Sequence, residues 1–217
     1  MAATGSNGTI RVWDPLIRIG HWVLVAAFAT AYLTEGEPEW LHTWAGYAIA
    51  ATVLLRIVWG FVGPKRARFS DFVTGPGRVV AYLKGLVSGK AERHIGHSPA
   101  GGAMTVALLL CLAVTAVSGM GRLAAEEGRG PLAGIVAAAP EGQGLRVHGE
   151  REDHEEYGEG REHGEGDEEE GFWAETHEIA ANLTLALILL HIAGVFFASY
   201  AHRENLARAM VTGAKRA

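Results

Sequence analysis

The sequence predicts an all-α integral membrane protein, a four-helix bundle formed by a single domain over residues 1–217. Nearly half of the 217 residues (49 %) are hydrophobic. They gather in four runs near the length that crosses a membrane, since about 20 apolar residues span the hydrocarbon core. The segments outside the runs alternate between acidic ones and ones rich in Lys and Arg. The single cysteine, Cys111, excludes an internal disulfide.

The expected spans are residues 16–34, 40–62, 100–121 and 173–201. Pro15 is well suited to open the first helix. Residues 75–90 place apolar side chains at helical spacing and basic ones elsewhere on the turn, which predicts an interfacial helix on an anionic membrane face.

The first run also permits another interpretation. Ala29, Thr30 and Ala31 resemble a small-residue cleavage site, so a removed signal peptide followed by a soluble domain is an alternative.

The placement of Lys and Arg predicts that both termini are cytoplasmic. Residues 63–99 hold seven basic and two acidic residues, and residues 202–217 hold four basic and one acidic. The first turnaround, residues 35–39, carries three glutamates and no basic residue.

The loop of residues 122–171 is strongly acidic, with twelve acidic residues between Gly149 and Glu170. Its low hydrophobicity and high charge predict a disordered outer loop. It is either a solvated linker, a docking patch for a basic partner such as a soluble cytochrome, or a divalent-metal site formed by carboxylates with His148, His154 and His163.

Four histidines fall inside the predicted spans. His177 and His191 lie fourteen residues apart on the fourth span, which separates them by roughly 21 Å on nearly one helix face. By depth, His42 matches His177 near the outer surface, and His21 matches His191 near the inner surface. A histidine inside a bilayer is a functional candidate, and imidazole is an axial ligand of haem iron. The four histidines therefore predict two pairs of axial ligands for two haems.

The haems would be non-covalent b haems, because the sequence has no Cys-x-x-Cys-His motif. Arg18 and Arg56 are expected at the depth of the inner haem, where they either pair with haem propionates or anchor the helices at the interface. Histidines that only hydrogen-bond between helices are the alternative to the haem prediction.

His94 and His97 lie just before the third span. They are predicted to be surface histidines at the start of that helix. The alternative is a shuttle for quinone protons.

The chain resembles the bacterial cytochrome b-561 family, which includes the b-type cytochrome subunits of nickel–iron hydrogenases. The residues that carry the resemblance are Arg18–Trp22, Leu41–Tyr47, Leu55–Gly60, Arg93–Gly101, and Glu175–Glu178 with the following segment to His191. Ser98 stands where the family pattern has Asn. The resemblance covers residues 10–203 apart from the acidic loop.

The resemblance implies a four-helix bundle with two haems and quinone-linked electron transfer, in the bacterial inner membrane. His21, His42, His177 and His191 match the ligand positions of the family. A membrane quinone, the lipid, and a soluble cytochrome or oxidoreductase subunit at the outer face are the expected partners.

The leading functional hypothesis is an electron conduit between the quinone pool and a redox partner, either as an electron-transfer protein or as a quinone-linked oxidoreductase subunit. A stand-alone oxidoreductase for superoxide or ferric iron at the outer face is an alternative. A non-redox membrane anchor with a metal-binding acidic loop is another. Phosphate-binding loops, HExxH, nucleophile triads and basic nucleic-acid patches do not occur in the sequence.

Overall fold

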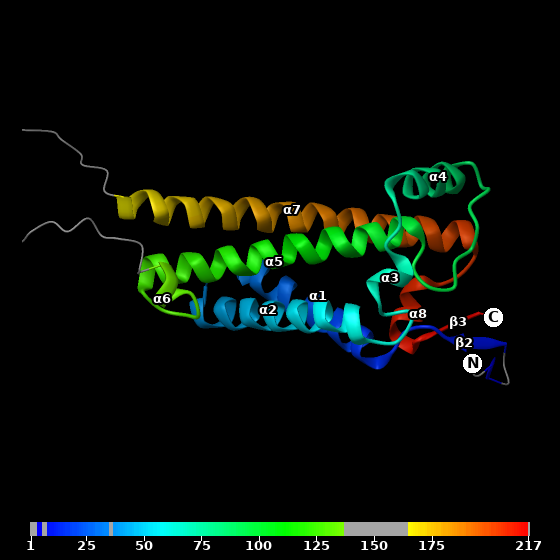
Figure 1. Ribbon diagram of the computed structural model, residues 1–217, viewed down its shortest axis with the longest axis horizontal. Helices are drawn as coiled ribbons and strands as arrows, with labels where there is room; N and C mark the ends of the chain where they lie inside the picture. The colour runs from blue at the N-terminus through cyan, green and yellow to red at the C-terminus, as the bar shows by residue number, and fades with distance from the viewer. Residues whose placement is uncertain (1–3, 6–7, 35–36, 137–164, 217) are drawn as a thin grey trace, which may run out of the picture. The chain divides into compact units, whose positions relative to one another are not determined.

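The computed structural model describes residues 4–5, 8–34, 37–136 and 165–216. The elements, most of them labelled in Figure 1, are β1 (Thr4–Gly5), β2 (Thr9–Arg11), α1 (Pro15–Thr34), α2 (Glu39–Val62), α3 (Phe69–Phe72), α4 (Pro76–Val87), α5 (Pro99–Glu127), α6 (Ala133–Val136), α7 (Glu165–His202), α8 (Leu206–Thr212) and β3 (Ala214–Arg216). Four helices, α1, α2, α5 and α7, are long and apolar enough to cross a membrane. The predicted fold class, a helical membrane bundle, is therefore confirmed.

The chain forms two compact units. Unit 1 comprises Met1–Ala116 and Ala180–Ala217, and unit 2 comprises Val117–Ile179. Unit 1 holds α1, α2 and parts of α5 and α7, together with both chain ends.

The core of unit 1 joins all four long helices. Ala27 and Phe28 of α1 pack with Ile49 and Val53 of α2 and with Leu109 and Leu112 of α5, and Leu185 and Ile188 of α7 pack against this cluster. The side chain of Thr184 on α7 is fully buried. Its Oγ1 donates to the carbonyl of Ala180 at 2.8 Å and lies 3.2 Å from Oγ1 of Thr115 on α5. The hydroxyls are thus satisfied inside the apolar core, as buried polar groups require.

Local signals set the start of two spans. As predicted, α1 begins at Pro15, and Oδ1 of Asp14 accepts a hydrogen bond from the backbone N–H of Ile17 at 2.9 Å. Oγ of Ser98 accepts from the N–H of Gly101 at 3.1 Å at the start of α5. Ser and Asn are both good residues for capping a helix N-terminus, so Ser98 performs the capping that Asn would perform in the family pattern.

Two helices extend beyond the expected spans, so the expected loop of residues 122–171 is shorter at both ends. Helix α5 continues to Glu127, supported by an ion pair of 2.7 Å between Arg122 and Glu126 one turn apart. Gly128, at φ +61°, then ends it. Helix α7 begins at Glu165 instead of Trp173. Disorder was predicted for the whole loop of residues 122–171, but residues 122–127, 133–136 and 165–171 are helical. The loop histidines lie in residues 137–164, outside the described residues.

The two chain ends form a small antiparallel sheet in the order β1-β2-β3, which the sequence analysis did not anticipate. Ile10 of β2 pairs with Lys215 of β3. Gly213, in the left-handed region at φ +80°, ends α8 and directs the chain into β3. The pairing holds the residues before α1 next to the C-terminal strand (Figure 1).

The helix predicted over residues 75–90 is observed as α4, somewhat shorter, and its place at a membrane interface stays a prediction. Tyr82 and Leu86 are buried, and the Tyr82 hydroxyl lies 3.1 Å from Nε2 of His202 at the end of α7. Val80, Leu83 and Val87 remain exposed. This helix therefore anchors to unit 1 by one face and keeps apolar side chains available for lipid.

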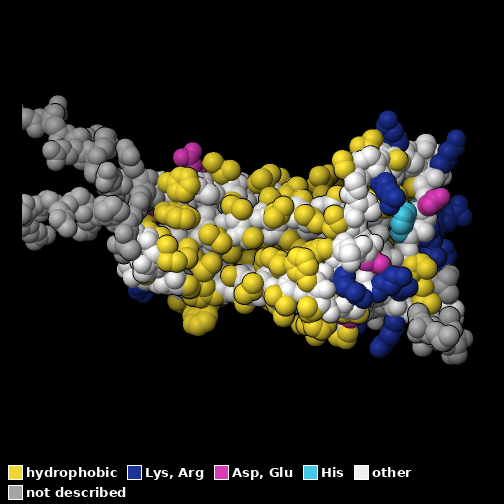
Figure 2. Space-filling model, in the orientation of Figure 1, with side chains coloured by type: hydrophobic (Ala, Val, Ile, Leu, Met, Phe, Trp, Pro, Cys, Tyr) yellow, Lys and Arg dark blue, Asp and Glu magenta, His cyan; other side chains and the backbone are white. Residues whose placement is uncertain are grey.

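The helices expose large apolar side chains along their length, among them Leu33 and Phe196, which are 82 % and 74 % exposed. Figure 2 shows these hydrophobic side chains over the helices and Lys and Arg gathered near α4. Such a surface is stable in lipid rather than in water.

Candidate functional site

His21 on α1 and His191 on α7 face each other in unit 1. Their ring centroids are 6.5 Å apart, and the planes make an angle of 55°. Imidazole–metal bonds are about 2.0–2.1 Å long, so a metal ion bound to one nitrogen of each ring would hold the ring centres roughly 6–7 Å apart. The observed separation fits a metal ion between the two rings.

The Nδ1 atom of His21 is buried and has no hydrogen-bond partner in the described part of the chain. The ring meets Trp22 edge to face, with centroids 5.2 Å apart. A buried polar atom without a partner needs a physical explanation. A group bound between His21 and His191 supplies one.

Arg56 of α2 is the second unsatisfied group near this pair. Gly20, next to His21, lies against Thr52, where a Cβ on Gly20 would be 3.4 Å from Cγ2 of Thr52. Arg56 is one helical turn beyond Thr52. Both terminal guanidinium nitrogens of Arg56 are buried, and neither has a hydrogen-bond partner among the described residues. An unpaired cation in a membrane span is costly, so it points to an anionic partner.

An aromatic platform supports Arg56. Its Cζ lies 5.1 Å from the ring centre of Phe69 and 5.7 Å from that of Phe72, both on α3. The ring of Phe69 packs directly on Gly60 of α2, where an added Cβ would lie 2.1 Å from Cε2. Phe72 packs on Gly102 of α5, where an added Cβ would lie 2.5 Å from the Phe72 carbonyl oxygen and 3.1 Å from ring atom Cδ2. The two glycines thus allow α3 to insert its rings under the guanidinium.

Arg18 is held differently. Its guanidinium donates a hydrogen bond to the backbone carbonyl of Val211, while its Nε is buried without a partner within the described ranges. Because Arg18 already binds the C-terminal segment, Arg56 has more unused donors for an anionic group than Arg18.

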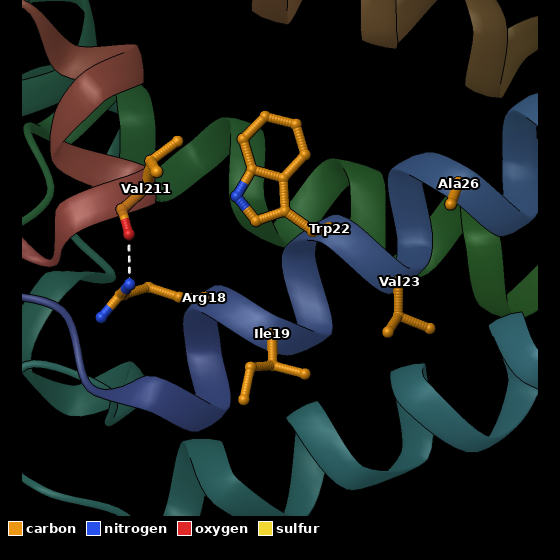
Figure 3. Close-up of a pocket in the computed structure, with 6 residues that line it drawn as sticks. All are labelled: Arg18, Ile19, Trp22, Val23, Ala26 and Val211. Carbon is orange, nitrogen blue, oxygen red and sulfur yellow. Dashed lines mark hydrogen bonds between the residues drawn. The ribbon is translucent and has the colours of Figure 1, made fainter.

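The Arg18–Val211 contact also borders a surface groove, shown in Figure 3. The groove has a volume of about 410 Å³ and is lined by Arg18, Ile19, Trp22, Val23, Ala26 and Val211. Ile19 and Trp22 are exposed. His21 is not part of the lining, so the groove is a lipid-facing surface separate from the imidazole pair.

His42 lies near the start of α2. Its Nδ1 is 2.9 Å from the carbonyl oxygen of Ala31 on α1. Since a carbonyl only accepts, Nδ1 carries the proton and donates, and this fixes the tautomer with a lone pair on Nε2. Metal-binding histidines commonly show this arrangement, in which the second nitrogen is oriented by a backbone carbonyl.

His177 belongs to unit 2. Its Nδ1 lies 3.4 Å from Oγ of Ser118 on α5. The ring packs so closely on Gly119 that a Cβ there would be 2.9 Å from Cε1 of His177. Gly121 makes the same kind of contact with Trp173. His42 and His177 lie in different units, and their pairing stays a prediction.

His94 and His97, predicted to be surface histidines before the third span, are both half-buried but differ in their surroundings. Nδ1 of His94 lies 3.0 Å from the carbonyl of Glu92 in an exposed contact. The His97 ring instead packs between Trp13 and Phe72, with centroid distances of 4.6 and 4.3 Å. Burial and the charges of Arg56 and Lys215 lower the pKa of His97 to about 3. A ring that is neutral at pH 7 is also unsuited to the proton-shuttle alternative.

A family model described as prokaryotic cytochrome b561 matches residues 12–213. The chain belongs to the prokaryotic cytochrome b561 family. Members of this family are membrane cytochromes that bind b haem and take part in electron transfer. No curated protein and no solved structure matches this cytochrome b561. His21 and Arg56 fit a haem, because an unprotonated imidazole nitrogen can bind its iron and a buried guanidinium without hydrogen-bond partners can pair with its carboxylates.

Sequence analysis of this cytochrome b561 did not identify several residues around the histidines. Phe69 and Phe72 support Arg56, and Gly119 accommodates His177. The sequence held one hint of the contact with Arg56, the two aromatic residues three positions apart in the FSDF segment. The glycine contacts depend on which helix packs opposite, so the sequence carried no signal for them.

Proposed function

We propose that this protein carries electrons between a membrane quinone and a redox partner at the outer face, through two b haems stacked across the bilayer. His21 and His191 would bind the inner haem, and His42 and His177 the outer one. Each haem would supply a one-electron carrier whose iron has no open position, which suits electron transfer rather than oxygen chemistry. The 6.5 Å separation of the His21 and His191 rings is the observation that carries the proposal.

Arg56 supports the inner site. Its unsatisfied guanidinium nitrogens and its aromatic platform suit a charge-assisted, bidentate contact with a haem propionate. Arg18 is a second candidate, although its guanidinium also binds Val211.

The hydrogen bond from His42 to Ala31 supports the outer site, because it favours the tautomer in which Nε2 of His42 carries a lone pair. In unit 2, Ser118 and Gly119 orient the ring of His177. The two rings would thus be prepared for ligation by separate local contacts.

The distribution of basic residues supports an inner-membrane location with both termini in the cytoplasm. The acidic segment would then lie outside, where it would attract a basic soluble partner.

Haem content tests the ligand assignment. The purified, detergent-solubilised protein is expected to contain two b haems per chain by extraction and by its reduced-minus-oxidised spectrum. His21→Ala and His42→Ala should each retain one, and the double variant none. His94→Ala is a matched control that should keep two. A colourless wild-type protein, or two haems in both single variants, would overturn the proposal.

Quinol oxidation tests whether the haems exchange electrons with a quinone, whichever way the electrons flow in the cell. Added quinol should reduce the haems of the wild-type protein rapidly, and ferricytochrome c or another soluble acceptor should reoxidise them. If quinol does not reduce either haem while dithionite reduces both, the quinone link is wrong.

A further inference from the structure

Two side chains of unit 1 that contact the same aromatic ring carry buried nitrogen atoms without hydrogen-bond partners among the described residues. Nδ1 of His97 is buried without a partner in the described part of the chain, and so are both terminal nitrogens of Arg56. The two side chains meet at Phe72, whose ring centre lies 4.3 Å from that of His97 and 5.7 Å from Cζ of Arg56. We call these two residues the Arg56–His97 pair.

The acidic residue that interacts with Arg56, Asp14, is already engaged. Oδ1 of Asp14 accepts from the backbone N–H of Ile17, and Oδ2 accepts from Nε1 of Trp59, each at 2.9 Å. Asp14 is near enough to influence Arg56 electrostatically. Both its oxygens accept from other donors, and neither terminal nitrogen of Arg56 makes a hydrogen bond to it.

The C-terminal strand adds a further positive charge beside His97. Lys215 is buried, and its Nζ lies 5.7 Å from the ring centre of Trp13, the residue that packs on His97. The same Nζ donates to the carbonyls of His94 and Gly96 at 3.4 and 3.5 Å. Arg56 and Lys215 are both close enough to act electrostatically on His97, so an anion would be stabilised beside the Arg56–His97 pair.

We propose that His97 is a positioning residue which, together with Arg56, binds a propionate carboxylate of the inner haem. The inference rests on the proposed function, since it assumes a haem between His21 and His191. A carboxylate supplies acceptors for both orphaned donor sets, and a contact made from two directions would fix the orientation of the haem about its iron–histidine axis.

The first test replaces His97 in the haem-loaded, full-length protein. His97→Phe keeps an aromatic ring between Trp13 and Phe72 but removes the donor. His97→Asn keeps an N–H close to the position of Nδ1. His94→Phe is the matched control, because His94 lies in the same segment and its ring contacts the carbonyl of Glu92 instead of the Arg56–His97 pair.

Two properties report on the contact, the rate at which haem transfers to apomyoglobin and the midpoint potential of each haem. His97→Phe should accelerate the loss of one of the two haems roughly tenfold or more. It should also lower the midpoint potential of that haem, because an unneutralised propionate favours ferric iron. His97→Asn should restore both values in large part, and His94→Phe should leave them unchanged.

A second test changes the cofactor and keeps the protein intact. Apoprotein reconstituted with haem dimethyl ester, which has no free carboxylate, should lose the inner haem faster than protein with natural haem. In protein that holds the ester, His97→Phe should not increase the rate of haem loss any further. The comparison of natural haem with the ester uses the wild-type protein. The test therefore still works if a His97 variant does not fold.

The outcomes separate this inference from the proposed function. If the wild-type protein binds two haems, His21→Ala removes one, and both His97→Phe and the ester leave haem loss and potential unchanged, His97 has no role toward the carboxylate. If the wild-type protein binds no haem at the His21–His191 pair, the proposed function itself fails, and this inference fails with it.

Discussion

Replacing Gly60 by alanine tests whether the close packing of α3 on α2 positions Arg56. An ideal Cβ at Gly60 would lie 2.1 Å from Cε2 of Phe69, and 2.5 and 2.6 Å from two further ring atoms. Carbon atoms in contact are about 3.5–4.0 Å apart, so the ring must move by more than about 1 Å. Phe61 and Phe72 pack edge to face on the same ring, with centroids 5.5 and 5.7 Å away, and they restrict that movement.

The expected magnitude follows from two opposing effects. Overpacking of this kind costs about 1–3 kcal/mol, while Gly→Ala in a helix gains up to about 1 kcal/mol. Gly77→Ala in α4 is a matched control, because an added Cβ there meets no described atom within 4 Å. One kcal/mol shifts the melting temperature of a chain of this size by about 2–4 °C. Gly60→Ala should therefore melt roughly 2–12 °C below Gly77→Ala.

Thermal unfolding in detergent, followed by far-ultraviolet circular dichroism, measures the difference. The potential of the inner haem should shift in Gly60→Ala as well, because the platform under Arg56 moves. If Gly60→Ala melts at or above Gly77→Ala, the argument that Phe69 is tightly confined under Arg56 is refuted.

Two further predictions concern the C-terminal contacts and the outer haem. Burial by itself raises the pKa of Glu204, but the hydrogen bond from Arg93 at 3.1 Å and the charge of Lys215 bring the pKa below its usual value. The ionised carboxylate thus stabilises the fold above pH 4.5, and this contribution is lost as the pH falls through the lowered pKa. Glu204→Gln should lower the free energy of unfolding by about 1–2 kcal/mol at pH 7. Its melting temperature should converge with that of the wild type in acid, and equal differences at both pH values would contradict this. Gly46 lies one turn from His42, and a Cβ there meets no described atom within 4 Å, so Gly46→Ala should fold normally. If a porphyrin packs there, redox titration should show a changed outer haem and an unchanged inner haem, and two unchanged haems would exclude such packing.

Much of the fold was predictable from one-dimensional patterns. Apolar runs of membrane-spanning length predicted α1, α2, α5 and α7, and Pro15 predicted the start of α1. Such features depend on the local sequence, because a span requires a length of apolar chain and a helix start requires a particular residue at its first turn. The extents of α5 and α7 were less predictable, since polar residues beyond the membrane continue both helices.

The sequence predicted the membrane depth of the histidines but not the distance between their rings. Helical rise and hydropathy predicted that His21 and His191 lie at one depth, but any rotation of α1 or α7 about its axis would separate their rings. Only the packing of those helices in unit 1 determines the 6.5 Å separation.

The remaining features depend entirely on tertiary structure. His97 is half-buried because Trp13 and Phe72, far from it along the chain, pack on its ring. The sheet forms because Thr9–Arg11 meets Ala214–Arg216, a pairing between opposite ends of the sequence. Hydrophobic periodicity reports which side of an element is apolar, but not which distant element covers it. The sequence by itself therefore determined the membrane helices and the ligand candidates, and the tertiary structure decided which donors are left buried without acceptors.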